Sequence, residues 1–208
     1  MTAAVAAAEA GTDGEIVTIV TERSDAYHDV GLHYALVAVL AATAVAAIWP
    51  GMFTPFDRGW EAADLRRDLT ALLIAQAAAF LIVRYTLAWM PLRLMLTPRA
   101  TKARRVRRRA VNYFRVGTES RTAGREGVLL YLSTAEHCAE IVVDEGVHRL
   151  VPAERWGDAM AALVDAVRDG RAGDGMVAAV TAIGAVLAEH LPKTADNPNE
   201  LPDRVIEL

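Results

Sequence analysis

The sequence predicts an α/β fold, in which a small sheet is flanked by helices, together with a two-helix transmembrane hairpin. Three short runs rich in apolar and β-branched residues predict the strands. Two longer apolar runs, placed between the first strand and the second, predict the hairpin. The 208 residues are enough for one ordinary domain plus membrane segments. The hydrophobic fraction of 53% exceeds the usual value of about 45–50%, which indicates that part of the chain faces lipid.

The first part of the soluble domain, residues 1–30, is predicted to contribute one helix and one strand. Residues 3–10 read AAVAAAEA and predict a helix that ends at a Gly-Thr-Asp-Gly turn. Residues 15–21 read EIVTIVT and predict a buried strand. Because one strand is not stable alone, its partners must come from the sequence beyond the hairpin.

The predicted hairpin and its two spans occupy residues 31–97, about 32–49 and about 69–90. The first run carries no charged residue and is close to the shortest length that crosses a bilayer. The second run contains Arg84, and two placements fit it. In one, the span continues to about Met90 and Arg84 reaches the membrane surface. In the other, the span ends near Val83 and the remaining residues lie along the interface.

Positive charge is concentrated immediately after the second apolar run. Because cytoplasmic flanks of membrane spans are enriched in Lys and Arg, this predicts a multi-pass protein of the cell inner membrane with both termini in the cytoplasm. It also predicts attraction to the lipid bilayer through anionic headgroups. Nucleic acid is not expected as a partner, because it needs a larger basic surface. The cationic residues are Arg99, Lys102, Arg104, Arg105, Arg107, Arg108 and Arg109.

The remainder of the soluble domain is assigned to residues 98–192. Residues 101–116 have apolar residues along one face and arginines elsewhere, which predicts a helix. Residues 127–133 and 138–143 predict two strands joined as a hairpin. These two strands are the expected partners of the strand that precedes the membrane hairpin.

Two further helices are predicted at the end of the domain. One has Pro152 in its first turn and ends at Gly170. The other runs from about Asp174 to just before Pro192, and its apolar stretch of about 14 residues is too short for a third span. The polar tail, residues 193–208, is predicted to be disordered.

Carboxylates in and beside the strand hairpin are the candidate metal ligands. Calcium and magnesium prefer several converging oxygen atoms, which Glu136, Asp144 and Glu145 would supply. The alternative interpretation is a solvated turn with ordinary acidic residues. Glu140 alternates with apolar neighbours, so it is expected to face out of the core or to line a cleft. Cys138, the single cysteine, cannot form an internal disulfide and is typical of a small buried residue.

Four segments of the chain resemble the TPM-domain family, which includes a thylakoid lumen acid phosphatase. They read GEIVTIV at 14–20, GVLLYLS at 127–133, AEIVVDEGV at 139–147 and GAVLAEHLP at 184–192. The resemblance is to the bacterial membrane-protein branch, in which two spans interrupt the domain. It implies a central sheet flanked by helices. It also implies links to phosphatase activity, divalent-metal binding and membrane-complex maintenance.

The leading functional hypothesis is a membrane-anchored domain without catalytic activity that binds a membrane-protein partner or the lipid surface. The sequence contains no Ser-His-Asp signature, no phosphate-cradling glycine loop and no Cys-x-x-Cys pair, so no catalytic residue is assigned. The alternative is a phosphatase in which a divalent cation, held by Glu136, Asp144 and Glu145, polarises a phosphoryl oxygen.

Overall fold

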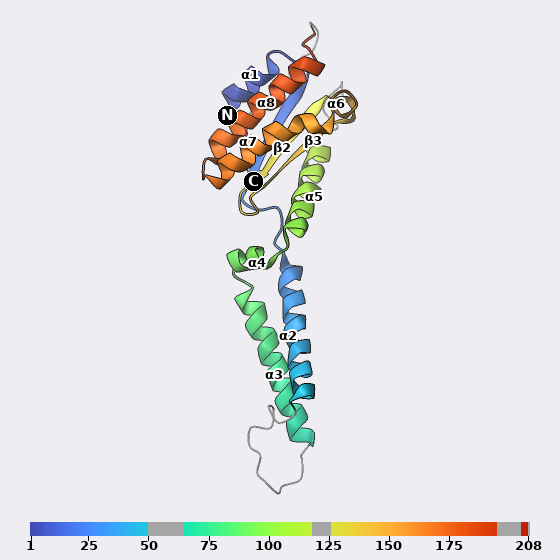
Figure 1. Cartoon of the computed structure of the whole chain (residues 1–208), viewed down its shortest axis with the longest axis vertical. Coiled ribbons are helices and arrows are strands. Elements are labelled where there is room, and N and C mark those ends of the chain that lie inside the picture. The colour runs from blue at the N-terminus through green and yellow to red at the C-terminus, as the bar shows by residue number, and fades with distance from the viewer. Residues whose placement is uncertain (50–64, 118–125, 195–204, 208) are drawn as a thin grey trace. The chain divides into compact units, whose positions relative to one another are not determined.

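The computed structural model describes four stretches of the chain: residues 1–49, 65–117, 126–194 and 205–207. The chain forms two compact units (Figure 1). The sheet unit comprises Met1–Asp25 and Arg99–Leu208, and the helical unit comprises Ala26–Pro98. The helical unit therefore interrupts the sheet unit in sequence. Residues 50–64, between the two predicted spans, and residues 118–125, between the predicted helix over 101–116 and the predicted strand at 127–133, lie outside the described residues.

A four-stranded sheet forms the centre of the sheet unit. The strand order is β3-β2-β1-β4, where β1 is Glu15–Thr21, β2 is Gly127–Ser133, β3 is Cys138–Val143 and β4 is Ile206–Glu207. β1 runs parallel to β2, and β2 and β3 form an antiparallel hairpin. β2 is buried along its whole length and β1 nearly so, which explains why both are continuous apolar runs. The three strands predicted from the sequence are confirmed with the same bounds.

The fourth strand lies within residues 193–208, which the sequence predicted to be disordered. β4 pairs in parallel with β1. Near the start of the tail, the backbone N–H and the hydroxyl of Thr194 donate to the carboxylate of Asp13 at 2.9 and 2.7 Å. A strand of two residues has almost no local signal, and it forms because β1 offers an edge for pairing. Residues 195–204 and 208 of the tail lie outside the described part of the chain.

Three helices cover one face of the sheet and enclose the larger core. They are α1 (Thr2–Glu9), α7 (Gly157–Arg168) and α8 (Ala172–His190) (Figure 1). Val128 and Leu130 of β2 are fully buried in this core. Because alternate side chains of a strand point to opposite faces, every second residue of β2 belongs to it.

The other face of the sheet is covered by α5 (Arg99–Gly117). Val106, Ala110 and Phe114 of α5 lie one turn apart and are buried against Leu129 and Tyr131 of β2. The arginines of α5 occupy the rest of its circumference. The predicted helix over 101–116 is thus observed, with its apolar face on the sheet.

Close helix crossings hold α8 in the larger core. A Cβ atom added at Gly184 would lie 2.5 Å from the Cβ of Ala8 in α1, and one added at Gly175 would lie 2.6 Å from the Cβ of Ala166 in α7. Real Cβ atoms do not approach so closely, so both positions require glycine for this packing. Glycine here lets the backbones of neighbouring helices approach.

The helical unit contains two long apolar helices, α2 (His28–Ile48) and α3 (Leu65–Thr86). They pack against each other, and the amide of Gln76 donates to the hydroxyl of Thr43 at 2.7 Å. Together with α8, these are the described helices that are long and apolar enough to cross a membrane. The buried share of the apolar window is 11% in α2, 0% in α3 and 39% in α8.

The second apolar run is not one helix up to Met90, as one of the two predicted placements required. α3 ends at Thr86, and a separate helix, α4 (Met90–Leu96), follows a three-residue turn. Pro91 explains the break, because proline lacks an N–H and is tolerated only in the first turn of a helix. Arg84 lies in the last turn of α3.

Arg93 of α4 is a buried cation that the sequence analysis did not single out. Its Nε donates to the carbonyl of Leu87 and its Nη1 to the carbonyl of Ala26, each at 2.6 Å. The side chain therefore joins the first residue of the helical unit, Ala26, to the turn between α3 and α4. Its role within this unit is structural, since a buried charge needs such partners.

Candidate functional site

Glu136, the first predicted metal ligand, lies in the turn between β2 and β3 and is buried. It accepts a hydrogen bond from the backbone N–H of Ser24 at 2.8 Å and another from the hydroxyl of Ser133. Ser24 Oγ also lies 3.0 Å from the hydroxyl of Tyr131. Glu136 thus ties the segment that follows β1 to the β2–β3 turn, which is a structural role.

Asp144 and Glu145, the other two predicted ligands, lie at the opposite end of β3. Asp144 is the N-cap of α6 (Glu145–Leu150), a short helix that the sequence analysis did not predict, and its Oδ1 accepts from the N–H of Glu145 at 2.7 Å. Asp144 is buried, and its Oδ2 has no hydrogen-bond partner among the described residues. The exposed carboxylate of Glu145 pairs with Arg149 one turn along α6.

The three predicted ligands therefore do not converge. Glu136 precedes the first residue of β3 and Asp144 follows its last, so about 20 Å of extended strand separates them. Within the described residues, no group of three or more His, Cys, Asp or Glu side chains lies close enough to hold a metal ion. The expected calcium or magnesium site built from all three carboxylates does not form there, because the strand places them at opposite ends.

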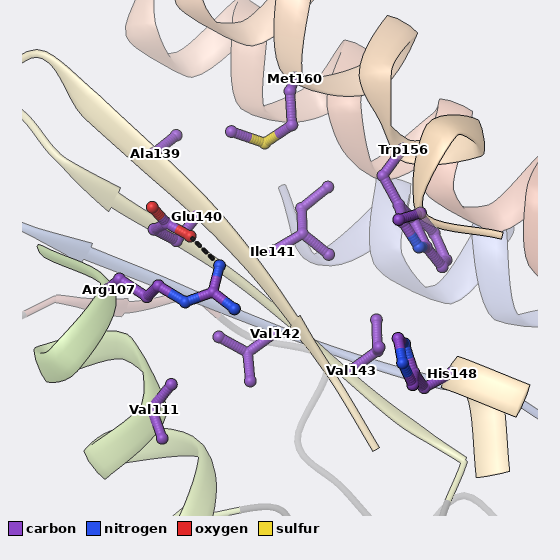
Figure 2. Close-up of a pocket in the computed structure, with 11 residues that line it drawn as sticks. Arg107, Val111, Ala139, Glu140, Ile141, Val142, Val143, His148, Trp156 and Met160 are labelled. Carbon is purple, nitrogen blue, oxygen red and sulfur yellow. Dashed lines mark ion pairs between the residues drawn. The ribbon is translucent and has the colours of Figure 1, made fainter. Parts of the chain in front are cut away.

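A groove runs along the outer edge of β3, between α5 and the segment from α6 to α7. Its cavity has a volume of about 430 Å³. Figure 2 shows Arg107 and Val111 of α5 on one side of β3, and Trp156 and Met160 on the other. Trp156 ends η2 (Ala153–Trp156), the 3₁₀ turn before α7. The walls of the groove are mostly apolar.

One ion pair lies in the groove. Arg107 Nη1 is 3.6 Å from Glu140 Oε2, and the Arg107 side chain is 72% exposed whereas that of Glu140 is 21% exposed (Figure 2). Burial raises the pKa of the Glu140 carboxyl above its usual value, and Arg107 opposes that rise. Glu140 lines a cleft, which is one of the two positions that the alternating pattern predicted.

A second, smaller cavity continues the groove toward the end of β3. It has a volume of about 250 Å³ and shares Val111, Val142 and Val143 with the first. Arg115 and Asp144 also line it. The groove is therefore bordered on the α5 side by two arginines separated by two helical turns.

Cys138 begins β3 and is half-buried. Its thiol donates to the carbonyl of Glu136 at 3.3 Å. Burial is the largest cause of a raised pKa at this thiol, and a raised pKa disfavours the reactive thiolate. The position behaves as the small buried residue that the sequence indicated.

The groove itself was not predicted from the sequence. Glu140 had a sequence signal, because it alternates with apolar neighbours, and Asp144 was a predicted metal ligand. The sequence did not distinguish Arg107 from the other arginines of α5. The helical spacing of Trp156 and Met160 in the sequence predicts the apolar face of one helix, and Trp156 does belong to the larger core.

Comparison with known proteins relates one segment of the chain to a known family. Residues 92–186, from α4 to α8, match the sequence model of the TPM_phosphatase family, described as the TPM domain. The fold is similar to the NMR structure of BA42 protein from the psychrophilic bacterium Bizionia argentinensis, with a TM-score of 0.56 and 16% identity over 99% of this chain and 88% of that one. At this identity the likeness concerns the fold alone. No curated protein matches the sequence.

Proposed function

We propose that this chain is an integral membrane protein of the cell inner membrane, which presents its TPM-like domain to the cytoplasm as a binding module. In this proposal, α2 and α3 cross the bilayer and both termini lie in the cytoplasm. The module binds a protein partner in or at the membrane, as expected of a domain that maintains a membrane complex.

The observation that carries the proposal is the exposure of large apolar side chains on α2 and α3. Val37 and Leu40 of α2 are each 60% exposed, and Leu73 and Ile82 of α3 are each 65% exposed. Exposed apolar surface of this extent is unfavourable in water and favourable in lipid. Both hydrophobic cores of the sheet unit are built from residues outside 26–98, so the exposed residues are not needed to complete them.

The charges that flank the two helices support the proposed orientation. The basic helix α5 begins at Arg99, directly after the helical unit. Cytoplasmic flanks carry such an excess of Lys and Arg. An exposed basic helix next to a span also attracts anionic lipid headgroups, by about 1 kcal/mol for each cation near the surface.

Cysteine labelling of intact cells tests this topology. In a Cys138→Ser background, we expect Arg58→Cys, between the spans, to react with a membrane-impermeant maleimide added outside the inner membrane. Thr194→Cys should react only after lysis. Labelling of Thr194→Cys in intact cells, or recovery of the unaltered chain in the soluble fraction, would contradict the proposal.

Binding to a partner is tested by crosslinking in the native membrane. Introducing a photoreactive residue at Arg107, in the groove, should give a discrete crosslinked band that is absent for the same residue introduced at Arg168, an exposed position on α7. Failure to crosslink at any groove position would count against a binding module without affecting the topology.

A divalent-metal-assisted phosphatase is the second candidate, and one observation favours it. The buried Oδ2 atom of Asp144 has no hydrogen-bond partner among the described residues. Asp144 and Arg115 line the same cavity. Asp144 and Glu145 would hold the cation, and Glu136 would not contribute. Hydrolysis of a generic phosphate ester by the detergent-purified protein, abolished by a chelator and by Asp144→Asn, would support it. Asparagine is chosen as the replacement because it removes the charge and still caps the helix.

A further inference from the structure

The outer edge of β3 carries backbone groups that face away from β2. β3 ends the strand order, and no described strand pairs with its outer edge. The N–H of Asp144, directly after β3, donates to the carbonyl of Gly127 at 2.9 Å. Backbone groups of an antiparallel strand alternate between its two edges, so residues at odd distances from Asp144 direct their N–H and C=O groups outward. These residues are Ala139, Ile141 and Val143.

The groove beside this edge has the shape that an extended peptide requires. Successive side chains of an added strand would point alternately to the two sides of the sheet. On the side of α7 they would meet Trp156, Met160 and the Ile141 side chain, which is an apolar surface (Figure 2). On the side of α5 they would meet Val111 and the cationic Arg107.

The charge along the α5 wall indicates which side chains the peptide would carry there. Arg107 and Arg115 line the two joined cavities, and Arg104 lies one turn before Arg107 on the same side of the helix. Arg104 and Arg115 have no ion-pair partner among the described residues, and Arg107 shares only Glu140. Acidic side chains on this side of an added strand would complement the three arginines.

We propose that the groove binds an extended segment of a partner protein, in which apolar residues alternate with acidic ones, as an added strand on β3. This inference rests on the proposed function, because it names the partner class of the binding module. The apolar residues face α7 and the acidic residues face α5, while the outward backbone groups of β3 supply the main-chain hydrogen bonds.

A second copy of this chain is a less suitable occupant. Pairing β3 with β3 of another copy would bring two α5 helices together, each with its row of arginines, and like charges repel. The opposite edge of the sheet already shows how this fold receives an extended segment, since β4 pairs there through Ile206 and Glu207. That edge is occupied by the chain itself, whereas the β3 edge is not paired by any described strand.

The test uses the full-length protein in detergent and fluorescent peptides with blocked ends. The probe alternates valine and glutamate, and its binding is followed by fluorescence anisotropy. Two controls separate strand addition from simple charge attraction: a peptide of the same composition with all glutamates at one end, and one that alternates valine and lysine. We expect saturable binding of the probe that weakens with salt, and binding at least about tenfold weaker for both controls, a difference of 1.4 kcal/mol or more.

Backbone pairing is tested in the peptide by N-methylation. Methylating one alternate set of residues removes the N–H groups that face β3, and methylating the other set removes N–H groups that face away. We expect one of the two methylated peptides to lose binding and the other to retain it. Equal affinity of both with the unmodified probe would overturn the proposal.

Two protein variants locate the site. Ala139→Pro removes an outward N–H without removing a β2–β3 hydrogen bond, so the edge strand should tolerate it while peptide binding is lost. Arg107→Gln alters an exposed side chain and should weaken binding several-fold, whereas Arg168→Gln on α7 should leave it unchanged.

Three outcomes would overturn the inference: binding that survives Ala139→Pro, no binding of the probe, or a dimer that Ala139→Pro converts to a monomer. The last would assign the edge to a second copy. None of these outcomes changes the maleimide labelling pattern, so the failure of this inference is distinguishable from the failure of the proposed membrane topology.

Discussion

α3 and α8 are helices of similar length and apolar composition, yet they present their side chains to different surroundings. The apolar window of α3 is 0% buried within the protein and that of α8 is 39% buried. α8 packs on α1, on α7 and against the sheet, whereas α3 packs on α2. Length and hydropathy therefore identify helices that are able to cross a membrane. Packing against other helices and the sheet distinguishes the core helix α8 among them.

Small residues account for much of the packing of α8. Gly184 and Gly175 permit close approach of α1 and α7, so that Ile183, Val180 and Leu187 become fully buried. α3 makes a different kind of contact, in which Gln76 bonds to Thr43 of α2 and the large apolar side chains remain outside. A polar contact between two apolar helices is typical of helices packed in lipid.

The largest expected effect comes from replacing residues 26–98 with a flexible Gly-Ser linker. We expect the shortened protein to move entirely from the membrane fraction to the soluble fraction and to keep a cooperative thermal transition, because its two cores use no residue of the helical unit. Cell fractionation and circular dichroism measure this. Persistence in the membrane fraction after alkaline extraction would mean that α8 is itself a membrane helix, which would reverse the comparison.

The next effect is at the crossing of α8 with α1. Gly184→Ala should lower the free energy of unfolding of the sheet unit by about 1–3 kcal/mol, since the new Cβ would overlap Ala8. Gly173→Ala is the matched control in the same helix, because nothing lies within 4 Å of its added Cβ and alanine favours the helix. Urea unfolding of the shortened protein measures both, and equal effects at the two glycines would contradict the packing described for α8.

A smaller effect is expected at the contact between α2 and α3. Gln76→Leu removes the hydrogen bond to Thr43 and should lower the stability of the helical unit in detergent by roughly 0.6 kcal/mol, the average for such bonds between membrane helices. A double-mutant cycle with Thr43→Val isolates the coupling. Additive effects of the two substitutions would show that the bond contributes nothing.

The smallest expected effect is a pH dependence confined to the sheet unit. Because burial raises the pKa of Glu140 in the folded state, the folded state disfavours the charged carboxylate. The contribution of Glu140 to the free energy of unfolding is therefore fully present below the pKa that Glu140 has in the unfolded chain. It is lost as the pH rises through the higher pKa of Glu140 in the folded state. Glu140→Gln should flatten this slope in urea unfolding between acidic and neutral pH. An unchanged slope would assign the pH dependence to other carboxyls, such as Glu126, whose pKa is also raised by burial.

Local patterns in the sequence were sufficient for the elements whose signal lies within themselves. β1, β2 and β3 were predicted with their observed bounds. The parallel strands β1 and β2 are buried and therefore read as continuous apolar runs, and β3 follows β2 closely as the second strand of a hairpin. The apolar face of α5 and the resemblance to the TPM family were also readable, since they depend on residue order along the chain.

The tertiary structure decided the features that depend on residues far apart in sequence. It separated Glu136 from Asp144 by the length of β3, paired β4 with β1, and placed Arg107 beside Glu140 at a sheet edge that no described strand pairs. It also packed into the larger core α8, a 19-residue helix whose apolar stretch the sequence had indicated to be too short for a span. The physical reason is common to all four: burial, pairing and ion contacts are set by neighbours in space, and a linear pattern records only neighbours along the chain.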